Sequence, residues 1–215
     1  MPFLKKIVTE NGVIGIWKIT EPAGSLISAF QFSENKKTVF QNFKGERRQK
    51  EYLATRLLLQ NILGEEAEVI YHESGKPLLK NSTLNISISH SSDYVVVFVS
   101  KEMCGIDIEN EDRNIDLVTK RFLHTEELAW IEKSNQRQML KIMHWCAKEA
   151  IFKCSCETGV RFDTQIFITP FEIGKAEFFS GKLTAGNRVV QYILRHFNVG
   201  DNMVVYCIED KIMSL

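Results

Sequence analysis

The order of helices and strands constrains this chain most, because a helical region followed by short strands occurs twice. Residues 46–63 carry apolar side chains at helical spacing and are followed by Gly64, which predicts a helix that ends there. Further helices are predicted at about 115–133 and 135–155. Since each helical region leads into antiparallel strands, the sequence predicts an α+β fold.

The strands are predicted from alternating polar and apolar residues, and from short apolar runs bounded by turn residues. Residues 84–89 alternate, and residues 94–99 form a continuous apolar run that predicts a buried strand over 94–100. The next short strand, 106–109, follows closely enough to form a hairpin with 94–100. The other predicted strands lie at 13–19, 67–71, 165–169, 175–179, 188–196 and 203–209.

A faint internal similarity suggests that the two halves arose by duplication. The segment from Asp93 to Phe98 reads DYVVVF, and the segment from Asp201 to Tyr206 reads DNMVVY. No low-complexity linker separates the halves, and the expected join lies near residue 102. We therefore expect an N-terminal subdomain of residues 1–102 and a C-terminal subdomain of residues 103–215.

Composition narrows the functional classes. The formal net charge of the 215 residues is zero, which argues against nucleic acid or an anionic membrane as a partner. No apolar run approaches the roughly 18 residues that span a bilayer, and the first residues lack the apolar core of a signal peptide. An odd count of five cysteines fits reduced thiols. We expect a cytoplasmic protein.

Two carboxylates share one face of the strand at 106–109. Side chains alternate along a strand, so Asp107 and Glu109 point to one side while Ile106 and Ile108 fill the other. Magnesium in proteins usually takes one or two carboxylates together with water and substrate phosphates. The pair therefore suits a magnesium site, and a solvated strand edge is the alternative.

Two further groups of polar residues have alternative interpretations. Trp145, Glu149 and Lys153 fall on one stripe of a helix. Glu149 and Lys153 can be a surface ion pair, or a carboxylate and an ammonium that face a phosphate. The hydroxyls and imidazole between Ser87 and Ser91 can donate to phosphate oxygens, or they can be a polar strand end.

Taken in order, these segments resemble a known family. The sequence reads Gly75-Lys76-Pro77, then NISISHS at 85–91, GIDIE at 105–109 and WCAKEAIFK at 145–153. This ordered set closely resembles the 4′-phosphopantetheinyl transferase superfamily, in its longer, surfactin-synthetase-activating type. Arg56, in the segment EYLATR, also matches a family position. The resemblance extends from about residue 46 to residue 155.

The resemblance implies both a fold and a reaction. The fold would have two similar subdomains related by a pseudo-two-fold axis, each with an antiparallel sheet packed against a long helix. Coenzyme A would lie in the cleft between them. The enzyme, a monomer, would transfer the 4′-phosphopantetheine moiety of coenzyme A to a serine of an apo acyl or peptidyl carrier protein. The reaction would depend on Mg²⁺ and release 3′,5′-ADP.

The resemblance also implies a role for each matching residue. Asp107, Glu109 and Glu149 would hold Mg²⁺ against the pyrophosphate. Asp107, Glu149 and Lys153 would be the catalytic residues, with Lys153 contacting the phosphates as 3′,5′-ADP leaves. The residues expected to bind the coenzyme are Arg56, Lys76, Pro77, Ser89, His90 and Lys153. The serine proton would go to Glu149, either directly or through a metal-bound water.

Some features depart from the family pattern or stay open. The segment 154–162 lacks most of the family's glycine-rich turn, and the first 45 residues carry no matching signature. Lys36 and Lys37 either meet a 3′-phosphate or belong to a solvated helix face. Alternative functions are a non-catalytic relative that binds coenzyme A or a carrier, and a different Mg²⁺-dependent phosphoryl-transfer enzyme. The motifs do not distinguish fatty-acid, polyketide and peptide carriers.

Overall fold

The computed structural model describes residues 3–32, 34–175 and 177–211. The elements of the first half are β1 (Phe3–Thr9), β2 (Gly12–Lys18), α1 (Ala23–Ala29), α2 (Glu34–Gln41), α3 (Glu46–Leu63), β3 (Val69–Tyr71), β4 (Pro77–Leu79), β5 (Asn85–Ser91) and β6 (Tyr94–Ser100). Those of the second half are β7 (Cys104–Asn110), a 3₁₀ turn (Asp116–Val118), α4 (Thr119–Phe122), α5 (Thr125–Ile131), α6 (Arg137–Ser155), α7 (Phe162–Gln165), β8 (Ile166–Ile168), β9 (Phe179–Ala185), β10 (Arg188–Val199) and β11 (Asn202–Glu209).

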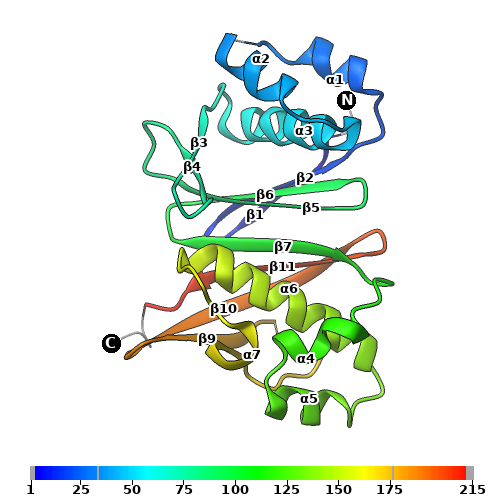
Figure 1. Ribbon diagram of the computed structural model, residues 1–215, viewed down its shortest axis with the longest axis vertical. Coiled ribbons are helices and arrows are strands. Elements are labelled where there is room, and N and C mark those ends of the chain that lie inside the picture. The colour runs from blue at the N-terminus through cyan, green and yellow to red at the C-terminus, as the bar shows by residue number, and fades with distance from the viewer. Residues whose placement is uncertain (1–2, 33, 176, 212–215) are drawn as a thin grey trace.

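The strands form two antiparallel sheets, and a long helix lies on the outer side of each (Figure 1). Within the described residues the first sheet has the order β1-β2-β6-β5-β4-β3, and the second has the order β7-β11-β10-β9-β8. The predicted α+β class, with an antiparallel sheet against a long helix in each half, is confirmed. Among the described helices, none has the length and apolar character needed to cross a bilayer.

The two sheets repeat one connectivity. In each sheet, a first strand (β2 or β7) leads to the long helix, and four further strands follow the helix. The last of these four, β6 or β11, pairs with the first strand. By this order β2 corresponds to β7, α3 to α6, and β6 to β11. The similar segments at residues 93–98 and 201–206 fall on β6 and β11. The faint sequence similarity therefore joins strands in equivalent positions.

The core consists of layers that explain the apolar run in β6. Every residue of β6 is buried, because the strand is covered on both faces. Val95 and Val97 pack into the cluster that contains α3. Val96 and Phe98 point the other way and pack with Ile106 of β7, between the two sheets. Figure 1 shows the resulting order of α3, first sheet, second sheet and α6.

The predicted hairpin of residues 94–100 and 106–109 is wrong. β6 pairs with β2 and β5, whereas β7 pairs with β11 in the other sheet. At Gly105 of β7, a side chain would place its Cβ 1.9 Å from the carbonyl oxygen of Ala150 on α6. The bare backbone lets α6 lie directly over β7. The Ile106 amide also donates to the Ser87 hydroxyl at 3.0 Å, which holds β7 beside β5.

The single helix predicted at 115–133 is also wrong, because the chain turns at Leu123 and a new helix begins. The Glu126 amide donates to His124 Nδ1 at 3.2 Å, and the His124 amide donates to the Glu127 carboxylate at 2.7 Å. This reciprocal pair is a capping box, which starts α5.

The strand predicted at 175–179 is wrong as well. Lys175 lies in a turn that follows Gly174, whose φ is 79°, and neither Glu177 nor Phe178 is in a strand, so β9 begins only at Phe179; residue 176 lies outside the described residues.

Candidate active site

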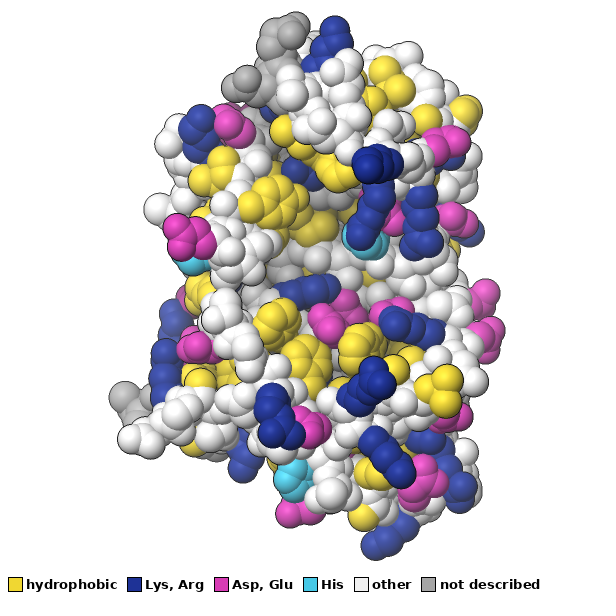
Figure 2. Space-filling model, viewed as in Figure 1, with side chains coloured by type: hydrophobic (Ala, Val, Ile, Leu, Met, Phe, Trp, Pro, Cys, Tyr) yellow, Lys and Arg dark blue, Asp and Glu magenta, His cyan; other side chains and the backbone are white. Residues whose placement is uncertain are grey.

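A cavity of about 470 Å³ lies between the two halves of the molecule. Its walls come from α3, the turn before β4, strand β5 and the C-terminal end of α6. Figure 2 shows a hollow across the middle of this face, with hydrophobic side chains inside it and basic side chains and a histidine at its rim. The cavity is thus suited to a partly apolar ligand that carries negative charge.

The structure brings most of the predicted coenzyme-binding residues to this one cavity. Its lining includes Arg56, Lys76, Pro77, His90 and Lys153. These residues come from four separate segments of the chain, so only the fold makes them neighbours.

The other predicted phosphate-binding candidates lie elsewhere. Ser89 does not line the cavity, and its side chain is buried behind Lys153. Lys36 is ion-paired with Glu66 and lies over the Phe30 ring. Neither Lys36 nor Lys37 lines the cavity.

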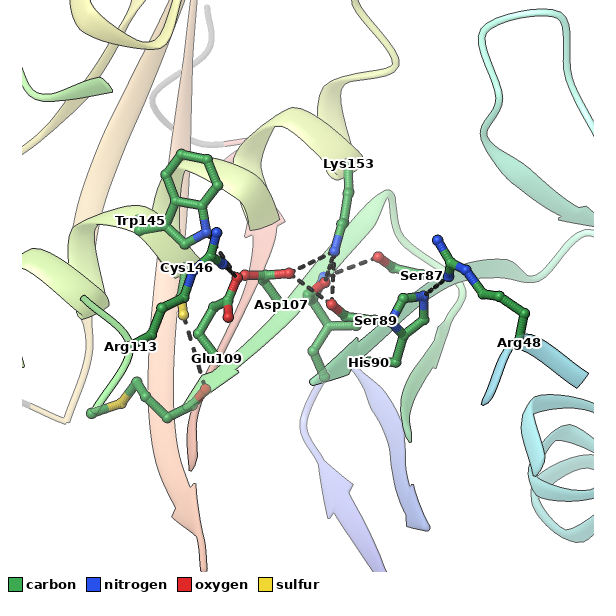
Figure 3. A network of polar contacts seen from close by, with 12 residues as sticks. Arg48, Ser87, Ser89, His90, Asp107, Glu109, Arg113, Trp145, Cys146 and Lys153 are labelled. Atoms are coloured by element: carbon green, nitrogen blue, oxygen red, sulfur yellow. Dashed lines mark hydrogen bonds and ion pairs between the residues drawn. The ribbon is translucent and has the colours of Figure 1, made fainter. Parts of the chain in front are cut away.

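Asp107 is the centre of a polar network beside the cavity (Figure 3). Lys153 Nζ and Ser89 Oγ each donate to Asp107 Oδ1 at 2.7 Å. Lys153 Nζ also lies 3.0 Å from Ser89 Oγ and 3.2 Å from the carbonyl oxygen of Ile106. Strands β5 and β7 and helix α6 each supply one member, so the network connects the two halves.

The second carboxylate of the strand pair is held from the opposite side. Trp145 Nε1 donates to Glu109 Oε1 at 3.0 Å, and the Arg113 guanidinium is ion-paired with the same carboxylate. Burial, followed by the charge of Asp107, raises the pKa of Glu109 above its ordinary value. The Trp145 indole therefore contacts Glu109 of the acid pair directly, whereas the sequence indicated only that Trp145 shares a helical stripe with Glu149.

Glu149 completes the group of carboxylates. Its carboxylate has no hydrogen bond to any part of the chain that the structure describes. Burial, and then the charge of Asp107, raises the pKa of Glu149 to about 7, and Glu109 adds in the same direction. Lys153 and Arg113 oppose this shift. The three acids therefore repel one another, and a cation among them would relieve that repulsion.

The donor set fits a hard cation in part. The buried Asp107 Oδ2 accepts no hydrogen bond within the described residues, and it is an oxygen ligand of the kind that Mg²⁺ prefers. The described residues contain no group of three acidic, histidine or cysteine side chains close enough to hold an ion by themselves. Magnesium usually takes one or two protein carboxylates and completes its shell with water and phosphates. A cation at Asp107 would therefore need further ligands from water and from a phosphate-bearing substrate.

The structure adds residues that the motifs did not mark. Arg48, Glu51 and Tyr52 of α3 line the cavity on the same wall as Arg56. A weak signal was present, because Glu51 follows Arg48 by three residues, the spacing of an ion pair on a helix. No sequence pattern near Arg48 or Glu51 indicated that the pair would contact His90, which lies on a distant strand.

Residues 103–198 match the family model described as the 4′-phosphopantetheinyl transferase superfamily. This region includes Asp107, Glu109, Glu149 and Lys153 but not the cavity wall formed by α3.

Similar proteins carry related names. The 4′-phosphopantetheinyl transferase gsp of Aneurinibacillus migulanus is 29% identical over 58% of this chain and 52% of its own. A putative 4′-phosphopantetheinyl transferase of Haemophilus influenzae is 30% identical over 58% of this chain and 56% of its own. The 4′-phosphopantetheinyl transferase AcpT of Escherichia coli O157:H7 is 32% identical over 51% and 59%. The matches thus span little more than half the length of these relatives.

A crystal structure of Thermotoga maritima holo-[acyl-carrier-protein] synthase aligns with a TM-score of 0.36 and 16% identity, over 50% of this chain and 62% of that one. That overlap is too small to support an argument. The family match and the named relatives agree with the ordered motifs, and the match to the gsp protein agrees with the longer type. Residues 103–198 of this chain are thus similar to the 4′-phosphopantetheinyl transferase superfamily, and the named relatives carry the same description.

Proposed function

We propose that the protein is an enzyme that transfers the 4′-phosphopantetheine moiety of coenzyme A to a serine of an apo acyl or peptidyl carrier protein and releases 3′,5′-ADP. The observation that carries this proposal is the cavity between the halves. Basic side chains from both halves line it, and the carboxylates around Asp107 lie directly beside it. A ligand with several phosphates, such as coenzyme A, suits this combination.

In this proposal, the role of each residue follows from its position around the cavity. Arg56, Lys76 and His90 would bind the nucleotide and its phosphates on the wall formed by the first half. Lys153 would face the pyrophosphate and stabilise the charge that develops as 3′,5′-ADP leaves. Asp107 and Ser89 keep the Lys153 ammonium in place through the contacts described above.

The carboxylates would have two roles, to bind a metal ion and to accept a proton. Asp107, Glu109 and Glu149 would hold Mg²⁺, which would neutralise charge on the phosphates during transfer. The carrier serine must also lose a proton when it attacks. A carboxylate whose pKa lies near 7 is suited to accept a proton near neutral pH, so Glu149 is the candidate base, directly or through a water.

Carrier labelling tests this function. The purified protein is incubated with coenzyme A, Mg²⁺ and an apo carrier, and the intact mass of the carrier is measured. We expect a gain equal to the phosphopantetheine arm. Carriers from fatty-acid, polyketide and peptide synthesis form three parallel arms, which would identify the preferred acceptor class.

A variant pair shows whether the activity belongs to this site. Asp107→Asn should lower the labelling rate about 100-fold or more, because the variant loses the charge that holds both Lys153 and the cation. Asp201→Asn makes the same chemical change at an exposed turn and should leave the rate unchanged. If folded parent protein labelled none of the carriers, the proposed function would be wrong. The cytoplasmic location and the monomeric state stay predictions from the sequence.

A further inference from the structure

Glu51 is a buried carboxylate that three basic side chains surround. Its exposed fraction is 5%. Arg47 Nε lies 2.9 Å from Glu51 Oε1, and Arg48 Nη1 lies 3.0 Å from Glu51 Oε2. His90 Nδ1 lies 3.6 Å from Oε1. The first two partners precede Glu51 on α3, whereas His90 comes from β5, so the carboxylate connects a helix to a strand.

The partners differ in where they point. Arg48 and His90 line the cavity together with Glu51, and Arg47 does not. The Arg47 side chain is 69% exposed, and an exposed ion pair contributes little to stability. The Arg48 side chain is 61% exposed as well, so the partners differ only in that Arg48 and His90 line the cavity and Arg47 does not.

Arg48 and His90 are also joined to each other. Arg48 Nη1 lies 2.8 Å from His90 Nε2, and Figure 3 shows the guanidinium reaching the imidazole across the gap between α3 and β5. A guanidinium has donors only, so His90 Nε2 must accept this bond. The ring proton then sits on Nδ1, on the side that faces Glu51.

The protonation of His90 agrees with this arrangement. Burial lowers the pKa of His90 below its ordinary value, and Glu51 opposes the shift. Arg48 and Lys153 add to the lowering. A neutral ring is what an acceptor at Nε2 requires.

We propose that Glu51 is a positioning residue for the nucleotide site: it orients Arg48, so that Arg48 fixes the His90 tautomer through Nε2 and presents its remaining donors to an anionic group of the ligand. This inference rests on the proposed function in one respect, because it takes the ligand of the cavity to be coenzyme A. Glu51 itself carries negative charge and therefore acts through Arg48 and His90.

The proposal makes a prediction opposite to that of simple electrostatics. Coenzyme A is an anion, so a nearby carboxylate that served only as a charge would weaken its binding. Removing that charge would then tighten binding. If Glu51 instead positions Arg48, its loss should weaken binding even though the cavity becomes more positive.

Calorimetric titration of coenzyme A into the protein without a carrier decides between these outcomes. For Glu51→Gln we expect Kd to rise about tenfold, the size typical of a lost charge-assisted hydrogen bond. Arg47→Ala is the matched control, because it removes the partner that does not line the cavity, and it should change Kd little. An unchanged or lower Kd for Glu51→Gln would overturn the proposal.

A double variant tests whether the effect passes through Arg48. Once Arg48→Ala has removed the group that Glu51 orients, Glu51→Gln should add little further loss of affinity. A full tenfold loss in the Arg48→Ala background would show that Glu51 acts in another way. Thermal unfolding of each variant separates misfolding from misplacement, and Glu51→Asp, which keeps the charge but shortens the side chain, replaces Glu51→Gln if the latter does not fold. Glu51→Asp should also weaken binding.

Steady-state kinetics provide a readout that a general structural defect would not reproduce. In Glu51→Gln the loss should lie in KM for coenzyme A rather than in kcat or in KM for the carrier. A parent protein that binds coenzyme A but labels no carrier would refute the proposed function alone, and the calorimetric comparison would still stand. A parent protein that binds no coenzyme A would refute both.

Discussion

At the scale of single residues, the pKa of Glu149 reflects its burial and the charges of the acids around it. Glu149 has no donor from the described residues, and burial together with Asp107 raises its pKa to about 7. Ionising Glu149 in this position costs free energy, because two other acids lie nearby and no hydrogen bond from the described part of the chain compensates the charge. A cation bound among the three acids, as proposed above, would offset that cost.

This leads to a prediction about pH and stability. The folded-state pKa of Glu149 lies above its ordinary value of 4.5, so its contribution to stability is present below that value and is lost as pH rises through about 7. In metal-free buffer, Tm of the parent should fall between about pH 5 and pH 8 by more than Tm of Glu149→Gln. Adding Mg²⁺ at pH 8 should raise Tm of the parent more than Tm of the variant. Equal pH profiles by scanning calorimetry would contradict this account.

Cys156 offers a chemical probe of the cavity. It is the exposed thiol among five free cysteines, it lines the cavity, and its sulfur lies 2.8 Å from Lys76 Nζ. The other four thiols are at most 1% exposed. Iodoacetamide should therefore alkylate one thiol of the native protein quickly.

If coenzyme A occupies the cavity beside Lys76, it should shield this thiol. Saturating coenzyme A is expected to slow the alkylation of Cys156 about tenfold or more, since access through the cavity mouth is needed. Intact mass and peptide mapping give the rate and the position. Cys156→Ser should lack the fast phase. An alkylation rate that coenzyme A does not change would place the ligand elsewhere.

At the scale of elements, helix α6 packs into the protein core through one face and borders the candidate site with another. Lys148 is fully buried, pairs with Glu127 at 2.7 Å and donates to the carbonyl oxygens of Phe162 and Ile166. The next residue, Glu149, lies among the carboxylates of the site. Adjacent residues of the motif thus anchor the helix on one side and face the candidate site on the other.

The close contact between α6 and β7 depends on Gly105. Because a Cβ at this position would lie 1.9 Å from a backbone oxygen of α6, Gly105→Ala should force the helix away from the strand. We expect a loss of about 3 kcal/mol in the free energy of unfolding, near the upper end of the overpacking range. Gly24→Ala, where a Cβ meets no atom within 4 Å, is the control. Urea denaturation measures both, and equal stability of the two variants would refute the packing argument.

For the whole molecule, the apolar layer between the sheets makes the halves interdependent. Ile14 and Ile16 of β2 pack in one cluster with Ile106 and Ile108 of β7 and with Val204 of β11. The polar network around Asp107 crosses the same boundary. Separating the halves would expose this layer and disassemble the site, so we expect them to fold together.

Tryptophan fluorescence can test this cooperativity. Trp17 is buried in the first half, while Trp130 and Trp145 pack against the core of the second. One variant keeps Trp17 alone and another, Trp17→Phe, keeps the other two. The two probes should report the same urea midpoint, as two-state unfolding requires. Distinct midpoints would show that each half unfolds independently.

The sequence by itself predicted the α+β class, the two long helices, most of the strands and the shared face of Asp107 and Glu109. These features depend on local periodicity, which records which side of an element is buried. The short helix α1 went unpredicted, and α2 entered only as the helix face offered as one alternative for Lys36 and Lys37, because seven or eight residues carry too weak a pattern.

Only the tertiary structure decided which elements meet. Alternation assigns residues to faces but does not name the partner strand, so β6 and β7 were wrongly joined. The same limit hid the contact between Arg48 and His90, which are 42 residues apart in the chain. The sequence thus specified the chemical groups of the candidate site, and long-range packing of α3, β5, β7 and α6 specified their geometry, because contacts between distant segments form only in the complete fold.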